Sequence, residues 1–204
     1  SHAVVNAHGY KKVNSATIGK LNNDKSGYDN LETVNCDCIC ISGNWTPTVH
    51  LSSQSGNKLK FDDKVNAFVP NISKQNEYTI GSANASSSLK NTLVEGFNTG
   101  YELSKKITGK NDKITIPTSN ERKYAQQDKF WCMPLPNNKY YKRCVDFQND
   151  VYVSDIQLAV REGFRSIEHV KRYTTLGMAT DQGRTSNLNG LQLVANIEKK
   201  IVPE

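Results

Sequence analysis

No stretch of this 204-residue chain stays apolar over the roughly 18 residues that a membrane-spanning helix requires, so we expect no membrane span. The first residues lack the charged-then-apolar pattern of a secretory signal peptide. Cysteine is scarce, with five residues, an odd number that does not fit the dense pairing of a disulfide-stapled secreted domain. These absences predict free thiols and a cytoplasmic location.

The sequence also lacks the usual constellations of catalytic chemistry: it has no paired carboxylates, no nucleophile-and-base triad and no set of metal ligands. Cys36, Cys38 and Cys40 alternate, but alternate strand residues do not readily converge on one tetrahedral ion, so we favour small core residues over a metal site. Cys132 and Cys144 have no histidine beside them in sequence to act as a base. We therefore predict no catalytic residue and no metal ligand.

The charge of the chain is mildly positive. Lysine plus arginine number 26 and aspartate plus glutamate 20, which gives a formal net charge of +6. The positive charges are spread along the chain rather than gathered in blocks. Such an excess permits an anionic ligand or partner but does not by itself indicate nucleic acid.

The first part of the chain has the alternation of β-strands joined by polar loops. A buried strand with apolar residues on both faces suits a parallel α/β sheet, whose ligands lie at the carboxyl ends of the strands. We expect strands at Lys11–Gly19, Val34–Ile41, Ala67–Val69 and Tyr78–Ile80, a hairpin connection at Leu21–Asn30, a turn at Gly43–Pro47 and a polar loop at Ser52–Lys64.

A loop of small residues, Gly81–Ser88, precedes a predicted helix that runs to about Lys106. Gly109 is a suitable helix stop, and lysines occupy the last turn. A strand, a small-residue loop and a helix in this order let the backbone approach a pyrophosphate or a ribose. The other interpretation is a simple tight turn.

The last part of the chain predicts short helices separated by glycines. We expect Ser154 with Gln157 as a capping box for the first helix, and Ser166 as the N-cap of the second. Gly163 and Gly177 should end these helices. A polar loop, Met178–Asn187, then opens a helix that we expect to continue to Val202. Such a helix start, with an arginine and hydroxyls nearby, suits an anion such as a phosphate.

Several motifs resemble the alpha subunit of heterotetrameric sarcosine oxidase. They are KRYTTLGMATDQGRTSN at 171–187, DFQNDV at 146–151, CISGNWTPTVHLSSQSG at 40–56 and AFVP at 67–70. That subunit is several times longer, so the chain resembles an internal piece of it. The resemblance implies an α/β fold, with the C-terminal part of an FAD/NAD(P)-binding-like domain at 1–116, a linker at 117–145 and a helical module at 146–204.

The resemblance also implies a function for the parent complex. Its alpha subunit would assemble with beta, gamma and delta subunits and oxidatively demethylate sarcosine to glycine. Hydrogen peroxide is formed, and tetrahydrofolate is converted to 5,10-methylenetetrahydrofolate. Amine oxidation occurs at FAD in the beta subunit, so the isolated piece should be inactive. NAD occupies the FAD-like site of the alpha subunit, and the candidates for its contact here are Ser82, Ala83, Ser87 and Leu89.

The module at 146–204 resembles the [2Fe-2S] domains related to bacterioferritin-associated ferredoxin. The four cysteine positions of those domains are occupied here by Asp146, Gln148, Asp181 and Ser186, so we expect no iron–sulfur cluster. The resemblance implies FMN at the interface of alpha and beta, held covalently by a histidine of beta. Candidates to lie beside it are Lys171, Arg172, Thr174, Thr175, Thr180, Asp181, Gln182, Arg184 and Thr185.

Other interpretations of the module stay open at this point. A capped helix with a solvated basic face would use the same residues. Ser154–Gly163 and Ser166–Thr175 also have about the lengths of a DNA-binding helix-turn-helix, although the second helix would present a mixed face with Glu168. A third alternative is a pure assembly scaffold that only docks the beta subunit.

Overall fold

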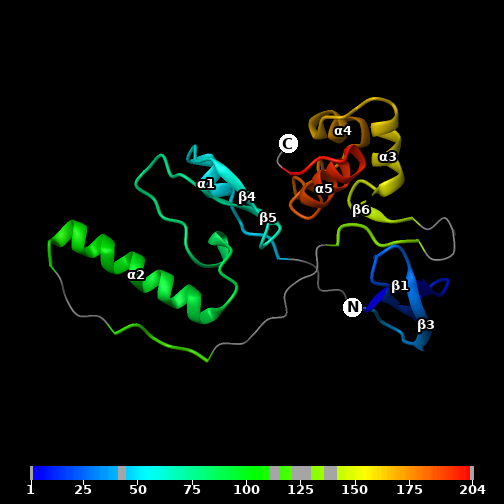
Figure 1. The fold of residues 1–204 in the computed structure, drawn as a ribbon, viewed down its shortest axis with the longest axis horizontal. Coiled ribbons are helices and arrows are strands. Elements are labelled where there is room, and N and C mark those ends of the chain that lie inside the picture. The colour runs from blue at the N-terminus through cyan, green and yellow to red at the C-terminus, as the bar shows by residue number, and fades with distance from the viewer. Residues whose placement is uncertain (1, 41–44, 111–114, 121–129, 136–141, 203–204) are drawn as a thin grey trace. The chain divides into compact units, whose positions relative to one another are not determined.

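The computed structural model describes residues 2–40, 45–110, 115–120, 130–135 and 142–202 (Figure 1). The chain forms two compact units, one made of residues 1–43 together with 130–204 and the other of residues 44–129. Both strands and helices occur, so the predicted mixture of α and β structure is confirmed. The predicted boundaries near residues 117 and 146 stay predictions about the parent chain.

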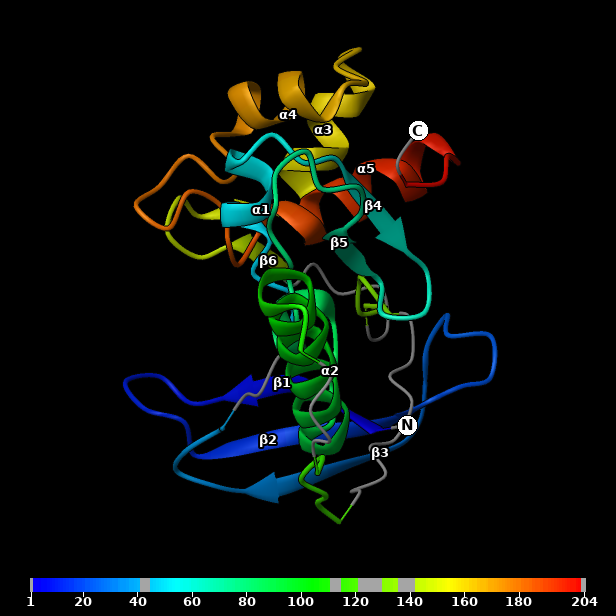
Figure 2. The same cartoon turned by 90° about the vertical axis from the view of Figure 1, so that its left-hand side faces the viewer.

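The first unit contains a three-stranded sheet in the order β1-β2-β3. Its strands are β1 (His2–His8), β2 (Ser15–Leu21) and β3 (Tyr28–Asn35), which Figure 2 shows side by side. The pairing is antiparallel, because the short connections at 9–14 and 22–27 leave no room for the crossover that parallel strands need. The predicted hairpin connection is thereby confirmed between β2 and β3.

The predicted buried strand Val34–Ile41 in a parallel sheet is wrong. β3 ends at Asn35, its last pairing partner in β2 being Ser15, and most of its residues are exposed. Cys38 and Cys40 are exposed in irregular chain. The apolar residues at 34–41 are typical of a strand, but β3 extends only as far as its pairing with β2, which ends at Asn35. Residues 41–44, with the start of the predicted turn at 43–47, lie outside the described residues.

The second unit contains a hairpin of β4 (Leu59–Asp62) and β5 (Ala67–Pro70), after a short helix α1 (His50–Gln54). The predicted strand at 67–69 is confirmed within β5. The predicted polar loop at 52–64 is wrong, since it includes the end of α1 and all of β4. The predicted strand at 78–80 is also wrong, because this segment is irregular and pairs with no described strand.

A 3₁₀ turn, η1 (Gly81–Asn84), leads to the long helix α2 (Leu89–Thr108). Ser88 is the N-cap, and its hydroxyl accepts a hydrogen bond from the N–H of Asn91 at 3.1 Å. Gly109 closes the helix in the left-handed conformation, with φ of 69°. The predicted helix and both of its ends are confirmed. No helix in the described residues is both long and apolar enough to cross a membrane.

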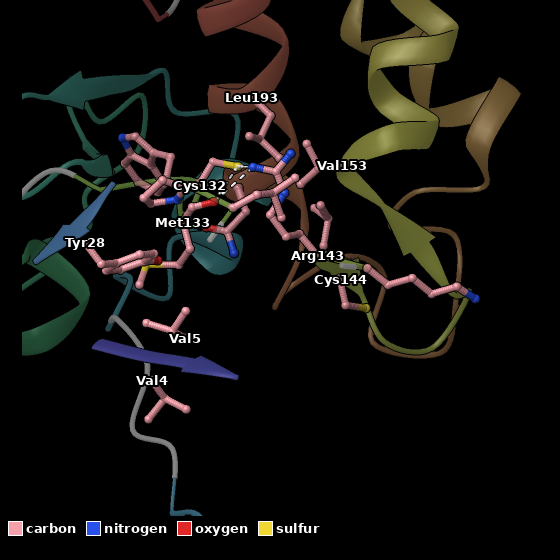
Figure 3. A pocket seen from close by; sticks show the side chains of 15 residues that line it. Val4, Val5, Tyr28, Cys132, Met133, Arg143, Cys144, Val153 and Leu193 are labelled. Atoms are coloured by element: carbon pink, nitrogen blue, oxygen red, sulfur yellow. Dashed lines mark hydrogen bonds between the residues drawn. The ribbon is translucent and has the colours of Figure 1, made fainter. Parts of the chain in front are cut away.

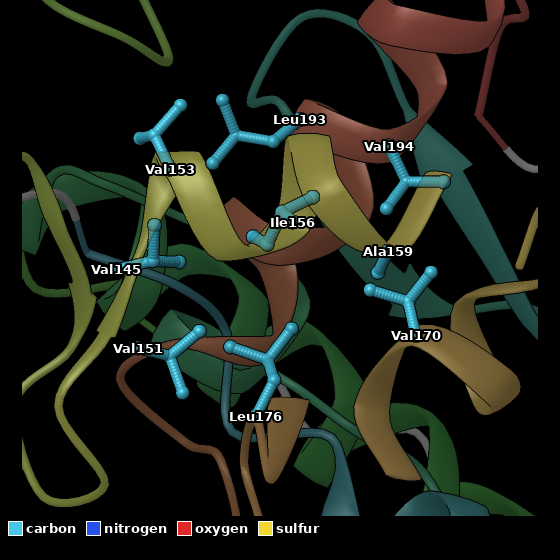
Figure 4. Packing of buried hydrophobic residues seen from close by; sticks show 9 residues of the cluster. All are labelled: Val145, Val151, Val153, Ile156, Ala159, Val170, Leu176, Leu193 and Val194. Carbon is cyan, nitrogen blue, oxygen red and sulfur yellow. The ribbon is translucent and has the colours of Figure 1, made fainter. Parts of the chain in front are cut away.

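The helical module of the first unit begins with a hairpin of β6 (Cys144–Asp146) and β7 (Val151–Tyr152). Its helices are α3 (Val153–Arg161), α4 (Ile167–Thr174) and α5 (Asn187–Glu198). They enclose an apolar core (Figure 4), and full burial of one such side chain contributes about 1.5–3 kcal/mol. The core residues are Val145, Val151, Val153, Ile156, Ala159, Val170, Leu176, Leu193 and Val194.

The ends of these helices follow the sequence signals only in part. Gly163, with φ of 99°, follows α3 as predicted. Ser166 occupies the N-cap position of α4 as predicted, but its side chain makes no capping hydrogen bond there. The capping box predicted at Ser154 is wrong: α3 begins at Val153 with Tyr152 as its N-cap, two residues before the predicted one, and the carboxylate of Asp155 accepts a hydrogen bond from the N–H of Tyr152 at 2.8 Å.

The ends of α4 and α5 also differ from the prediction. Thr175, not Gly177, is the left-handed residue that directly ends α4, with φ of 62°. Its carbonyl accepts a hydrogen bond from the side chain of Asn149, a tertiary contact that local sequence does not reveal. The helix α5 ends at Glu198, short of the predicted Val202.

Candidate functional site

The buried carboxylate of Asp146 joins three segments of the helical module. Asp146 is 1% exposed. Its Oδ1 accepts hydrogen bonds from the backbone N–H groups of Gln148 at 2.9 Å and Asn149 at 3.3 Å. Its Oδ2 accepts the N–H of Gly177 at 2.8 Å and the hydroxyl of Ser186 at 3.4 Å. The β6–β7 turn, the loop after α4 and the start of α5 are therefore fixed to one group.

Two further hydrogen bonds connect the same turn to the same loop. The hydroxyl of Thr180 donates to Oε1 of Gln148 at 2.8 Å, and Nδ2 of Asn149 donates to the carbonyl of Thr175 at 2.8 Å. Residues 147–150 and 174–186 thus form one continuous polar surface, which we call the loop surface. Asp146 lies beneath it.

Asp181 organises the loop surface from within. Its Oδ1 accepts a hydrogen bond from the N–H of Gly183 at 3.0 Å. Its Oδ2 accepts hydrogen bonds from the N–H of Thr185 at 3.2 Å and from the hydroxyl of Thr185 at 2.8 Å. The Thr185 hydroxyl, followed by the Gly183 N–H, lowers the pKa of Asp181 below its usual value. The carboxylate is therefore ionised at neutral pH, the state that accepts the hydrogen bonds from Gly183 and Thr185.

The fold brings the predicted FMN-contact residues to α4 and the loop that follows it, but gives them different roles. The hydroxyl of Thr174 donates to the carbonyl of Val170, and that of Thr175 to the carbonyl of Thr174. These threonines, like Thr180, serve the loop itself. Arg172 is exposed and pairs with Glu168 one helical turn away, at 3.6 Å.

Three of the predicted residues carry side chains that are uncommitted within the described structure. Lys171, Gln182 and Arg184 form neither a side-chain hydrogen bond nor an ion pair there. Gln182 and Arg184 are exposed, and Lys171 is partly exposed. Two cations and an amide are thus free to contact a ligand. Which of the predicted residues touch a cofactor stays a prediction.

The residues at the former cysteine positions lie in the loop surface or, as Asp146 does, directly beneath it. Asp146 and Ser186 are within hydrogen-bonding distance, and Gln148 is connected to the loop of Asp181 through Thr180. The oxygen and amide groups of these residues form hydrogen bonds with other side chains of the module and with its backbone. In the parts of the chain that the structure describes, no three His, Cys, Asp or Glu residues form a group that could hold a metal ion.

Of the predicted NAD-contact residues, Ser82 and Ala83 lie in η1, Ser87 follows it, and Leu89 is the first residue of α2. Ser82, Ser87 and Leu89 are exposed, and Ala83 is partly exposed. A residue that the sequence analysis missed, Glu95 of α2, supports this loop from below. Its carboxylate accepts the N–H of Gly81 at 2.8 Å and the hydroxyl of Ser86. The sequence offered a signal for it, since Glu95 is the first acidic residue of the helix.

Comparison with known proteins gives consistent matches. Residues 140–204 match the family model described as the sarcosine oxidase A3 domain. The chain is 34% identical over 165 residues to the sarcosine oxidase subunit alpha of Rhizobium meliloti (strain 1021), covering 80% of this chain and 16% of that protein. It is 27% identical over 195 residues to the subunit of the same name from Corynebacterium sp. (strain P-1), covering 91% and 19%.

A solved structure has a similar fold. The crystal structure of L-proline dehydrogenase from P.horikoshii matches with a TM-score of 0.62 and 20% sequence identity, covering 97% of this chain and 39% of that one. At this identity the likeness concerns the fold alone. The chain spans 16–19% of the length of the curated proteins named above.

Proposed function

Since the chain is similar over most of its length to alpha subunits of sarcosine oxidase, as its motifs predicted, we propose that it forms an internal part of such a subunit. The parent complex would contain beta, gamma and delta subunits and demethylate sarcosine oxidatively at FAD of the beta subunit. Its products would be glycine, hydrogen peroxide and 5,10-methylenetetrahydrofolate. The chain itself would supply cofactor contacts rather than catalytic groups.

We propose that the loop surface lies beside FMN at the interface of alpha and beta. The observation that carries this proposal is the rigid support of the loop by Asp146, combined with the uncommitted side chains of Lys171, Gln182 and Arg184. A flavin mononucleotide needs cations near its phosphate and donors near its ring, and these residues fit both needs. When bound, FMN would accept electrons, while this chain would hold and orient it.

The loop between η1 and α2 would supply part of an NAD site through Ser82, Ala83, Ser87 and Leu89. Their exposure supports this proposal, because a loop braced by Glu95 presents them outward. The glycine-rich half of such a site would lie elsewhere in the parent chain. We therefore expect poor affinity of this chain alone for NAD.

The test is to reconstitute the complex with Lys171→Ala and Arg184→Ala in the alpha subunit. Arg161→Ala, at the exposed end of α3, is the matched control for loss of a positive charge. We expect the Lys171→Ala and Arg184→Ala variants to lower FMN content and slow electron transfer from FAD to FMN, and the control to change neither. Unchanged flavin content and unchanged transfer in both variants would contradict the proposal.

The assembly alternative is favoured by one observation on the loop surface. Phe147 and Met178 belong to this surface and are 82% and 59% exposed, so two apolar side chains of the loop surface are open to a partner. If the surface only docks the beta subunit, then Phe147→Ser should prevent assembly. Flavin content would stay normal in the complex that still forms with Lys171→Ala.

A further inference from the structure

The first unit contains a partly open cavity of about 300 Å³ that the proposed function does not use (Figure 3). This volume is at the lower end for small-molecule sites. The walls come from β1, β3, the segment 131–135, the β6 region, α3 and α5. Most of the lining is apolar, including Val4, Val5, Leu135, Val145, Val153 and Leu193.

The described lining of the cavity contains basic residues and no acidic one. Its lining includes Lys142 and Arg143 but neither Asp nor Glu, and the sequence from 130 to 145 contains no acidic residue. The ammonium of Lys142 lies over the ring of Tyr152, 4.9 Å from its centroid. Arg143 is partly buried, and its guanidinium has no anionic partner among the described residues, so its charge is available to an anion that enters the cavity.

Arg143 meets only neutral acceptors in the described residues. Its Nη1 donates to Sγ of Cys132 and to the carbonyl of Met133, both at 3.0 Å, as the dashed lines in Figure 3 show. Burial raises the pKa of the Cys132 thiol, and the nearby Arg143 only partly opposes this. The thiol therefore stays neutral and leaves the guanidinium charge uncompensated.

Tyr28 adds an unused donor to the same cavity. Its hydroxyl is buried and has no hydrogen-bond partner in the part of the chain that the structure describes. Burial, together with the nearby Cys132, raises the pKa of Tyr28, so the phenol keeps its proton. Buried polar groups are nearly always satisfied, and an unsatisfied hydroxyl at a cavity wall indicates a missing acceptor.

We propose that this cavity binds a small carboxylate with an apolar body. The carboxylate accepts hydrogen bonds from the guanidinium of Arg143 and the hydroxyl of Tyr28, and the apolar body contacts the valines and leucines of the lining. A planar guanidinium matches a carboxylate in shape, which favours this anion over a halide. The neutral alternative, an uncharged apolar ligand, is an outcome of the test.

The test uses benzoate and its neutral counterpart benzamide, titrated into the 204-residue chain and followed by calorimetry. We expect saturable binding of benzoate and at least tenfold weaker binding of benzamide. Arg143→Gln should weaken benzoate binding about tenfold or more, and Tyr28→Phe about two- to tenfold. Arg161→Gln, outside the cavity, should leave binding unchanged.

Tyr28→Phe separates binding from folding, because it removes one oxygen atom that has no partner in the described structure. Its thermal midpoint should equal or exceed that of the unchanged chain while its affinity for benzoate falls. Equal affinity for benzoate and benzamide, an absence of saturable binding, or an equal loss in Arg161→Gln would each overturn the proposal.

Discussion

The carboxylate of Asp146 accepts the backbone N–H of Gly177 at 2.8 Å, across 31 residues of sequence. This bond, with those from Gln148, Asn149 and Ser186, makes a buried carboxyl group the meeting point of the module. Each such hydrogen bond contributes about 0.5–1.5 kcal/mol or more, and together they offset the cost of burying this polar group. The loop surface depends on this group without containing it.

Replacing Asp146 should destabilise the module strongly. In Asp146→Asn one acceptor oxygen becomes a donor that faces backbone N–H groups, so we expect a loss of about 2–4 kcal/mol in the free energy of unfolding. Asp150→Asn makes the same chemical change in the same turn, at an exposed left-handed residue that asparagine tolerates. It should change stability by less than about 0.5 kcal/mol. Urea denaturation measures both, and equal losses would contradict the role of Asp146.

The stability of the loop surface should depend on pH through Asp181. Its pKa is lowered in the folded chain, so its contribution is present above its usual value of 3.8 and is lost as pH falls through the lower folded value. The unchanged chain should therefore be more stable than Asp181→Asn at pH 7, and the two should converge in strong acid. Thermal denaturation between about pH 2 and 7 checks this. A difference that persists at the lowest pH would argue against the ionised carboxylate as its cause.

Gly190 should resist replacement for a steric reason. A Cβ atom built at this position would lie 2.3 Å from Cδ2 of Leu176, which is fully buried. We expect Gly190→Ala to lower the free energy of unfolding by about 1–3 kcal/mol, despite the better helix propensity of alanine.

Gly100→Ala in α2 is the matched control for Gly190, because nothing lies within 4 Å of the Cβ that it would add. It should raise stability by up to about 1 kcal/mol through helix propensity alone. Calorimetry measures the change in the free energy of unfolding of both variants. Stabilisation by both substitutions would show that Leu176 yields without cost.

Glu95 should hold the loop before α2 in place. Glu95→Ala removes the acceptor of the Gly81 N–H, so the exchange of that amide with solvent should accelerate about tenfold, as expected for one hydrogen bond to a charged group. Glu102→Ala, an exposed acid on the same helix, should leave the exchange of Gly81 unchanged. Hydrogen exchange followed by NMR measures both. Unchanged protection in Glu95→Ala would mean that the loop is held by other contacts.

Local signals in the sequence placed some helix ends and misplaced others. Ser88 and Gly109 bound α2 as predicted, and Gly163 and Ser166 mark the connection between α3 and α4. A capping hydroxyl or a left-handed glycine acts within one helical turn, so such signals succeed where no other group competes, as they did not at Ser154 and Gly177. The motifs at 146–151 and 171–187 likewise pointed to the sarcosine oxidase alpha subunits, because such a resemblance is a property of the sequence.

Only the tertiary structure decided which strands pair and which polar groups meet. The apolar run at 34–41 could not show that β3 ends with its partner in β2, since strand limits depend on a second segment. The acidic side chain of Asp146 gave no local sign of burial beside Gly177 and Ser186, and Tyr28 gave none of its place in the cavity of Arg143. These groups come from distant parts of the chain, and their contacts exist only once packing has removed water from between them.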